Sequence, residues 1–293
     1  MTTAALVNYR ARMRRVLDHI DQNLDGDLGL AALARVAAFS KYHFHRQFAA
    51  TFGITVHRYV QLARMKRASY WLAFRDDANI TAVALDAGYE ASDAFTRAFR
   101  DRIGQTPSAF RNSPDWERWR EAFAPLSQAR SKLMANYSAA DVNIREVPET
   151  PVAVMQHRGD PARIGETIQR FIAWRRAAAL PPKVSATFNV FHDDPRTTAP
   201  AKYRLDLCAA TGSPIAANDH GVEAGSIPGG RCAVLCVVGS ADDLEPAALF
   251  LYRDWLPASG EEPRDFPLFC QRVTFFPDVP EHAAITDLYL PLK

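Results

Sequence analysis

The chain has 293 residues, of which 48% are hydrophobic, and this is enough for about two domains that each bury a core. No apolar run reaches the roughly 18 residues that span a membrane, and residues 1–15 lack the apolar block of a signal peptide, so we expect a cytosolic protein with no membrane partner. Residues 1–112 contain 16 Lys and Arg residues and 10 Asp and Glu residues, whereas residues 113–293 contain 19 and 23. A basic first part fits a nucleic-acid-binding domain, although a solvated basic surface has the same charge.

Residues 1–112 have the periodicity of helices throughout. Apolar residues recur at intervals of three and four, and glycines or paired aspartates interrupt them, which predicts about seven short helices in an all-α domain. A longer helix over His57–Arg75 should fix the separation of the elements on either side of it. We expect its Tyr59, Val60 and Trp71 to lie in the core.

A sixteen-residue window of this domain occurs twice. Residues 44–59 align with residues 95–110 at an offset of 51, and six positions match, among them Gly53 with Gly104. Each copy follows another helix and a turn of small residues, which are Ala37-Ala38 in the first copy and Ala87-Gly88 in the second. A helix, a tight turn and a helix, present twice, predict two helix-turn-helix units.

The second helix of each unit is the candidate recognition helix. After the N-cap Ser40, Phe44, Phe48 and Phe52 are spaced by four and should face the core. The outward surfaces of the two helices then provide the candidate DNA contacts, which are Lys41, Tyr42, His45, Arg46, Ser92, Asp93, Thr96, Arg97 and Arg100. A solvated helix face is the alternative for each of these residues taken singly.

Four basic residues fit two kinds of DNA contact. Arg46 and Arg97 are placed where an arginine can form a bidentate pair with guanine O6 and N7 in the major groove. Lys41 and Arg100 are better placed for phosphates. Two rigidly joined recognition helices can occupy successive major grooves about 34 Å apart, so a monomer can read a long asymmetric site.

The remaining candidates are polar or aromatic. Tyr42 can contact a thymine methyl group or a sugar, and His45 and Thr96 can donate to a base edge or a phosphate. Asp93 has two interpretations. It can accept from cytosine N4, or it can lower affinity and tune specificity.

The second part of the chain has a different texture. Residues 113–140 are polar and predict a connector, with a candidate helix over Asp115–Met134. In residues 141–293, strand-like runs and two helical segments, Arg163–Ala178 and Leu244–Trp255, predict an α+β domain. The expected strands are Val142–Val147, Val152–His157, Ala186–Phe191, Arg204–Ala210, Cys232–Val238, Phe269–Phe275 and Ile285–Leu290.

The sequence of this α+β domain also contains an internal repeat. Ala153-Val154 matches Ala233-Val234 at an offset of 80, and Trp174 matches Trp255 at 81. We expect a strand, a helix and two strands, formed twice around a cleft that can hold a ligand. The candidate ligand-binding residues are Trp174, Phe188, Tyr203, Trp255 and Phe269, and a place in the core is the alternative for each.

The four cysteines all lie in this second part. A cytosolic protein should keep them reduced, and in a strand Cys232 and Cys236 would be about 13 Å apart, too far for a disulfide. We expect buried hydrophobic residues, with a thiol sensor or a soft-metal site as the alternative.

Motifs for other chemistry are missing from the sequence. His43 and His45 diverge on a helix, so they do not form a metal pair, and Asp193-Asp194 before Pro195 is typical of a turn, with a lone metal or ligand contact as the alternative. There is no HExxH, P-loop, GxGxxG or GxSxG motif. We therefore expect no catalytic residues, no metal and no cofactor.

Residues 13–111 resemble the DNA-binding domain of the AraC/XylS family of regulators. The resemblance implies base contacts in the first unit from Tyr42, His45 and Arg46. In the second unit it implies base contacts from Ser92, Asp93, Thr96 and Arg97. One departure is Ala38, where the family often has glycine, and alanine fits there if its φ stays negative. The matching segments are Leu28-x4-Leu33-Ala34, the run from Phe39 to Phe48, Gly53, Ile80-x-Ala82-Val83-Ala84, Gly88-Tyr89, Phe95-Thr96-Arg97-Ala98-Phe99, and the run from Gly104 to Arg111.

Residues 141–292 resemble the gyrase-inhibitor-like effector-binding domain, in the order found in Rob-type regulators. The resemblance implies a small hydrophobic effector, frequently a cation. Where that family tends to have Phe-Glu-x-Tyr, this chain has Phe269-Cys270-Gln271-Arg272, so the acid is missing and an anionic or neutral aromatic effector is at least as well supported. The matching segments are Ala153-Val154, Gly159, Trp174, 193–195, 206–208, 227–230, 255–260 and 286–292.

The sequence therefore predicts a transcription regulator that is not an enzyme. Its partners should be double-stranded DNA at a promoter or operator and a small, hydrophobic or aromatic effector, with RNA polymerase as a further candidate. Two alternatives stay open for the second domain. It can be a protein-interaction module, or a hydrolase of small electrophiles with Cys270 as the nucleophile.

Overall fold

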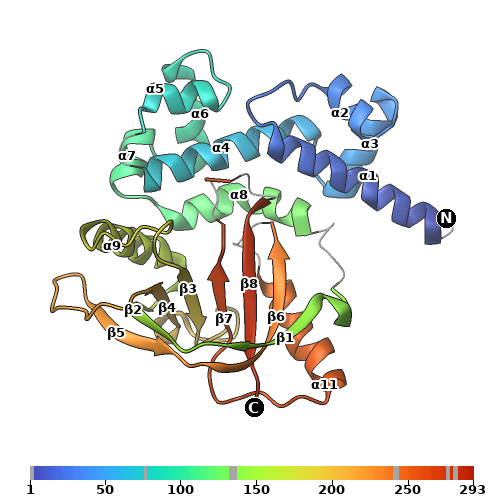
Figure 1. Ribbon diagram of the computed structural model, residues 1–293. Coiled ribbons are helices and arrows are strands. Elements are labelled where there is room, and N and C mark those ends of the chain that lie inside the picture. The colour runs from blue at the N-terminus through green and yellow to red at the C-terminus, as the bar shows by residue number, and fades with distance from the viewer. Residues whose placement is uncertain (1–2, 76–77, 132–136, 240–243, 275–277, 280–282) are drawn as a thin grey trace. The chain divides into compact units, whose positions relative to one another are not determined.

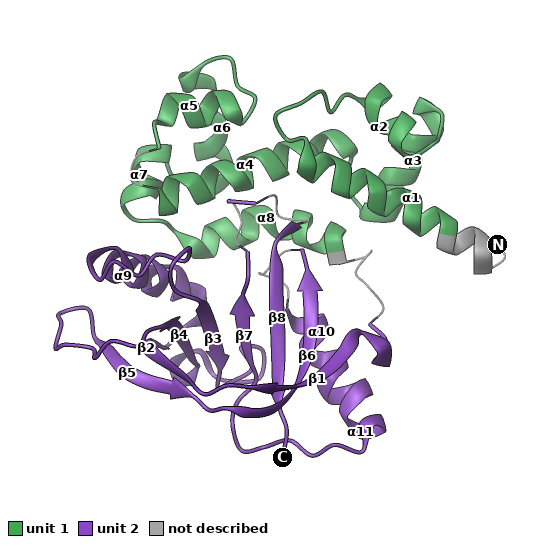
Figure 2. Ribbon diagram, viewed as in Figure 1, with its two compact units in different colours: residues 1–135 green, residues 136–293 purple. Residues whose placement is uncertain are grey.

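The computed structural model describes residues 3–75, 78–131, 137–239, 244–274, 278–279 and 283–293, and it contains two compact units, residues 1–135 and residues 136–293 (Figure 2). Among the described helices, none combines the length and the apolar character needed to cross a membrane. The two-part architecture, a helical unit followed by an α+β unit, confirms the predicted fold class.

The first unit is all-helical, and the helices before residue 112 follow the predicted pattern (Figure 1). Its helices are α1 (Thr3–Gln22), α2 (Leu30–Val36), α3 (Lys41–Phe52), α4 (Val56–Phe74), α5 (Ile80–Asp86), α6 (Ser92–Ile103), α7 (Pro107–Asn112) and α8 (Trp116–Ser131). Helices α2 and α3 form the first helix-turn-helix unit, and α5 and α6 form the second.

The two copies related by the offset of 51 residues share helix boundaries as well as residue types. Helix α3 ends at Gly53 with φ 76° and α6 ends at Gly104 with φ 81°, both in the left-handed conformation that glycine adopts without a steric cost. Two residues later a threonine caps the next helix: Thr55 Oγ1 accepts from the Arg58 amide at 3.3 Å, and Thr106 Oγ1 from the Ala109 amide at 3.2 Å.

The turn of the first unit differs from the expectation for Ala38. Its φ is 54°, and the matching Gly88 has φ 84°. The amide of Phe39 donates to Ala34 O and that of Tyr89 donates to Ala84 O, each at 3.0 Å, so both turns close in the same way. The hydrogen-bonding geometry of the turn requires a left-handed residue here, and an alanine in that conformation costs about 1 kcal/mol or more.

The expected connector is mostly a helix of the first unit. Trp119 and Phe123 of α8 are buried in the same core as the phenylalanines of α3 and α6. Trp119 Nε1 donates to Ser69 Oγ on α4 at 2.7 Å, and Arg130 pairs with the buried Asp21 of α1 at 2.7 Å. The unit therefore extends beyond the expected boundary at residue 112, because the apolar residues of α8 face inward; residues 132–136 lie outside the described residues.

The second unit is an eight-stranded antiparallel sheet in the order β1-β6-β8-β7-β3-β4-β2-β5 (Figure 1). Helix α9 (Ile164–Ala177) and the continuous segment of α10 (Glu245–Leu249), a π-helical turn (Phe250–Trp255) and α11 (Leu256–Ser259) complete it. The strands are β1 (Val142–Val147), β2 (Thr150–Arg158), β3 (Thr187–Phe191), β4 (Arg204–Ala210), β5 (Val222–Ile227), β6 (Gly230–Val238), β7 (Phe269–Arg272) and β8 (Ile285–Pro291).

The predicted duplication is present with one strand more in each copy. The first copy contains β1 to β4 and the second contains β5 to β8. Exchanging each strand with its counterpart in the other copy gives the same strand order read from the opposite edge of the sheet. Strand β1 pairs with β6 and β5 pairs with β2, so the copies exchange their first strands. The sequence prediction missed β5 because this edge strand contains Glu223, Gly225 and Ser226 and lacks an apolar run. It also placed the end of β7 at residue 275, whereas the strand ends at Arg272 and residue 275 lies outside the described residues.

The two faces of this sheet bury separate cores. Helix α9 covers one cluster, which includes Phe171, Trp174 and Tyr203, and α10 to α11 cover a second cluster, which includes Trp255, on the same face. We call this the helix-covered face. The opposite face carries a third cluster of strand residues with Phe188, Phe269 and Tyr289 at its centre.

Candidate nucleic-acid interface and effector site

The first recognition helix presents its candidate DNA contacts outward. Ser40 Oγ accepts from the His43 amide at 3.4 Å and so starts α3 where the sequence predicts. Phe44 and Phe48 are fully buried, which turns the opposite side of the helix to solvent. Lys41, Tyr42, His45 and Arg46 are all exposed, and Tyr42 is 86% exposed, a large aromatic surface for an uncomplexed protein.

The second recognition helix is also oriented as predicted, with a different terminus. Phe95, Phe99 and Ile103 are buried, while Asp93, Arg97 and Arg100 are exposed and Ser92 and Thr96 are half-buried. Its N-cap is Ala91, which offers no side-chain acceptor, and the first turn contains Asp93 instead. A carboxylate at this position stabilises the helix through the N-terminal end of the helix dipole, so Asp93 has a structural role in addition to the two DNA-binding interpretations.

The candidate DNA contacts differ from two structural arginines of the first unit in their bonding within the protein. None of the nine candidate side chains makes a hydrogen bond or an ion pair with another residue in the described parts of the chain. Arg64 and Arg130, by contrast, are held by the protein: Arg64 Nε donates to Leu24 O at 2.6 Å, and Arg130 pairs with Asp21. Because the side chains on the recognition helices are not engaged internally, their donors are available to a phosphate or a base edge.

Helix α4 ties the two helix-turn-helix units together. Arg67 pairs with Asp25 in the loop before α2, and its Nη2 also donates to Asp86 O at the end of α5 at 2.9 Å. Arg64 reaches Gly26 O at 3.0 Å from the same part of the helix. One side chain thus bridges the first unit and the second, which supports a fixed separation between the recognition helices.

The five candidate ligand residues do not come together. Trp174 and Tyr203 lie under α9, Trp255 lies under α10 to α11, and Phe188 and Phe269 lie on the opposite face. Each is at most 8% exposed. The alternation of a strand places Phe188 on one face and its neighbours Thr187 and Asn189 on the other, so no single cleft on one face contains all five.

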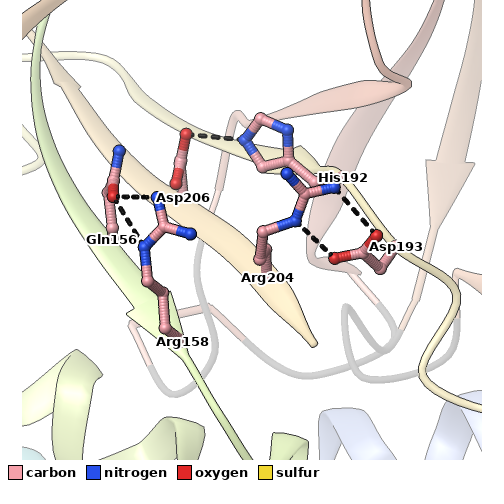
Figure 3. Close-up of polar contacts among 6 residues, drawn as sticks. All are labelled: Gln156, Arg158, His192, Asp193, Arg204 and Asp206. Atoms are coloured by element: carbon pink, nitrogen blue, oxygen red, sulfur yellow. Dashed lines mark hydrogen bonds and ion pairs between the residues drawn. The ribbon is translucent and has the colours of Figure 1, made fainter. Parts of the chain in front are cut away.

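One end of the opposite face carries a polar network (Figure 3). His192 Nε2 lies 2.7 Å from Asp206 Oδ2, Arg204 Nε donates to Asp193 Oδ2 at 2.9 Å, and Arg158 donates to Gln156. The Arg204 guanidinium lowers the pKa of Asp193. Asp194 is paired in turn with Arg196 at 2.9 Å, so both carboxylates of the predicted turn are neutralised by arginines. The described residues contain no cluster of His, Cys, Asp and Glu suited to a metal ion.

The centre of the helix-covered face carries polar groups that the sequence predictions missed. Arg272 on β7 lies between Thr187 on β3 and Thr286 on β8, which are its partners in the strand register. Arg272 Nε donates to Asn189 Oδ1 at 2.7 Å. Only the departure at residues 269–272 pointed to this place, because the pairing of β3 with β7 is not visible in the sequence.

The cysteines are not poised for nucleophilic chemistry. Cys208, Cys232 and Cys270 are buried, and none of the four is in a disulfide. Burial raises the pKa of the Cys270 thiol to about 11 and that of Cys208 further. Burial and the neighbouring Asp287 raise the pKa of the exposed Cys236. These thiols stay protonated at neutral pH, which argues against the alternative with Cys270 as a nucleophile.

Two family models match the chain. Residues 33–113 match a helix-turn-helix domain, and residues 140–293 match the GyrI-like small molecule binding domain. The probable transcriptional regulator YgiV of Escherichia coli K12 is 41% identical over 153 residues, which are 52% of this chain and 96% of YgiV. The right origin-binding protein of Escherichia coli K12 is 32% identical over 105 residues, only 36% of either chain.

Solved structures show weaker similarity. The cryo-EM structure of an EcmrR–DNA complex has 14% sequence identity and a TM-score of 0.44, over 86% of this chain and 82% of that one. The crystal structure of the EcmrR C-terminal domain has 16% identity and a TM-score of 0.43, over 52% of this chain and 96% of that one.

Proposed function

The chain belongs to the family of GyrI-like small molecule binding domains, and we propose that its second unit binds a small hydrophobic or aromatic effector that alters DNA binding by the first unit. Coupled to a helix-turn-helix domain of the AraC type, this family membership makes the chain a DNA-binding transcription regulator. The effector class, the DNA contacts and RNA polymerase as a further partner are parts of the proposal.

The observation that carries the DNA-binding part is the paired set of unengaged side chains. The recognition helices have the same length, the same C-terminal glycine conformation and the same buried phenylalanine spacing. Both present an exposed arginine, Arg46 or Arg97, at positions offset by 51 residues. We propose that each helix enters a major groove and that these two arginines read guanines.

The effector part of the proposal is supported by polar side chains that are buried in the otherwise apolar interior of the second unit. Arg175 is 4% exposed and Asn189 is 3% exposed, each among strands and helices that otherwise bury apolar side chains. Binding sites for small molecules typically combine apolar walls with a few convergent polar groups. We propose a sensing role for this unit, with neither the hydrolase nor the protein-interaction alternative favoured by a specific feature.

The test uses the full chain and an operator obtained by selection from random duplexes. Dissociation constants are measured at fixed salt with and without a panel of small aromatic cations, anions and neutral compounds. We expect at least one compound to raise the thermal stability and to change the operator affinity. At 100 times its dissociation constant, a compound should stabilise the native protein by about 2.7 kcal/mol. Operator selection without enrichment would contradict the DNA-binding part, and a panel without effect on either readout would contradict the effector part.

A further inference from the structure

We propose that the helix-covered face of the second unit contains an anion-binding site, centred on Arg272, that holds the carboxylate of a small aromatic effector. This inference rests on the proposed function, because it names the chemical class of the effector. Four residues form the site: Arg272, Arg175, Asn189 and Thr286.

Arg272 has hydrogen-bond donors that are not used within the described residues. Its Nε is used by Asn189 Oδ1 at 2.7 Å, which orients the plane of the guanidinium. No other hydrogen bond and no carboxylate partner of Arg272 occurs within the described residues. The two terminal nitrogens of a guanidinium present a fork that matches the two oxygens of a carboxylate. The side chain is half-buried, so an anion paired with it would be partly shielded from water.

A second guanidinium adjoins the same residues. Arg175 of α9 donates to Thr187 Oγ1 at 2.5 Å, to Leu180 O at 2.6 Å and to Ser185 O at 2.7 Å. Burial lowers its pKa to about 10, so it remains charged at neutral pH. Thr187 is also the register partner of Arg272, and in the described parts of the chain neither arginine has a carboxylate partner. Two buried or half-buried cations without a counter-charge favour the binding of an anion.

A buried hydroxyl beside Arg272 lacks a partner. Thr286 is 1% exposed, and its Oγ1 makes no hydrogen bond. It lies directly opposite Arg272 in the pairing of β7 with β8 and on the same face of the sheet. An unsatisfied buried hydroxyl is unfavourable, and a ligand oxygen held by Arg272 would accept its hydrogen bond.

The aromatic part of the effector has a neighbour on the same strand as Asn189. Phe191 lies two residues further along β3, on the same face, and it adjoins both of the clusters covered by helices. It is half-buried, so an aromatic ring can stack against it or meet its edge.

The opposite face has the complementary chemistry and provides the contrast for the test. There the rings of Phe269 and Tyr289 are stacked at 4.7 Å, and Asp206 and Asp287 occupy equivalent positions of the two copies. A cationic aromatic effector would fit that face, with the carboxylates as its counter-charges. The charge of the preferred compound therefore distinguishes the two faces.

The experiment measures binding of three matched probes to the full chain by calorimetry: 1-naphthoate, 1-naphthamide and 1-naphthylmethylammonium. We expect 1-naphthoate to bind at least about 10-fold more tightly than 1-naphthamide, since a charge-assisted hydrogen bond replaces a neutral one. Arg272→Met should weaken 1-naphthoate binding by about 10- to 100-fold and leave 1-naphthamide nearly unchanged. Thr286→Val, which keeps the shape of the side chain, should weaken it by a smaller factor. Arg145→Met removes an arginine from β1 on the opposite face and should have no effect.

Reversing the charge at Arg272 is the most stringent test of the anion site. Arg272→Glu should exchange the preference, so that 1-naphthylmethylammonium binds more tightly than 1-naphthoate. Equal binding of 1-naphthoate and 1-naphthamide, or full retention of 1-naphthoate binding in Arg272→Met and Thr286→Val, would overturn the anion site. If the cation or the amide binds most tightly to the wild type and shifts the operator affinity, the proposed function stands and only the anion site fails. If no probe binds, the anion site fails, whereas the effector part of the proposed function fails only if the wider panel of compounds also changes neither the thermal stability nor the operator affinity.

Discussion

The two helix-turn-helix units share a scaffold and differ in the surface that the scaffold presents. Gly53 and Gly104 end the recognition helices in the same conformation, and Ala38 and Gly88 both adopt positive φ in the turns. The exposed side chains have diverged: the first helix presents Tyr42 and two histidines, whereas the second presents Asp93 and Arg100. The comparison teaches that the buried residues and turn residues of the repeat specify folding, whereas Arg46 and Arg97 are repeated but exposed. The exposed residues that differ between the copies are the candidates for reading different bases.

The largest expected effects come from the one arginine that both surfaces keep. Arg46→Ala or Arg97→Ala should each weaken operator binding by about 1–3 kcal/mol and relax the base preference at one position, because a bidentate pair with guanine is lost. The measurement is a dissociation constant for the operator and for each single-base variant, at fixed salt. If the two units read separate half-sites, the two substitutions will relax different base pairs.

A matched control removes the same charge elsewhere in the unit. Arg120 on α8 is exposed, like the two recognition arginines. Arg120→Ala should leave both the affinity and the base preference near those of the wild type. Equal losses in all three variants, without a change in base preference, would show that the arginines act only through net charge.

The next comparison is between Ala38 and Gly88, which adopt the same left-handed backbone conformation in the two turns. Gly88→Ala should lower the free energy of unfolding by about 1–2 kcal/mol, since alanine is strained at positive φ. A Cβ at this position would also lie 2.8 Å from Arg64 Nη1, so the arginine that contacts Gly26 O would have to move. Denaturant unfolding of the full chain measures the change. A neutral result would mean that the turn relaxes to a negative φ.

The reverse exchange should stabilise the protein. Ala38→Gly relieves the strain at φ 54° but increases the conformational entropy of the unfolded chain, so we expect a net gain of about 0.5–1 kcal/mol in the free energy of unfolding. Ala37→Gly is the control, because Ala37 has φ −72° and a glycine there should destabilise. The two adjacent substitutions thus have opposite predicted signs, and a shared sign would contradict the role of backbone strain.

The same contrast shows what the sequence could predict. Helix boundaries in the first unit follow from the spacing of apolar residues, and the repeat places both recognition helices, because these signals are local. The alignment of Ala38 with Gly88 contained the information for its positive φ, but alanine does not suggest that conformation. Trp119, Phe123 and Leu126 of α8 recur at intervals of four and three and mark its buried face, but the charged residues between them give the segment the composition of a polar connector.

In the second unit the sequence predicts most of the individual strands but not which strands pair with one another. Most strands and the duplication follow from apolar runs and matching segments. The contacts of Arg272 depend on which residues of β3 and β8 lie beside β7, and that register comes from pairings across more than 80 residues of chain. The five aromatic residues were grouped by type, whereas the alternation of side chains along each strand separates them onto two faces.

The smallest expected effect concerns Asp93, an acidic residue of the second recognition helix at the position where the first has Tyr42. Asp93→Asn should cost about 0.3–1 kcal/mol in the free energy of unfolding, because α6 has no side-chain N-cap and loses the favourable interaction of a carboxylate with its N-terminus. At the same time it removes a negative charge from an exposed recognition surface, so affinity should rise modestly for all sequences and the salt dependence should steepen. A loss of affinity confined to one cytosine would instead identify Asp93 as a direct reader of cytosine N4. Because Asn can still accept one hydrogen bond, Asp93→Ala separates these cases: it should keep the general gain in affinity if repulsion dominates, and deepen the local loss if direct reading does.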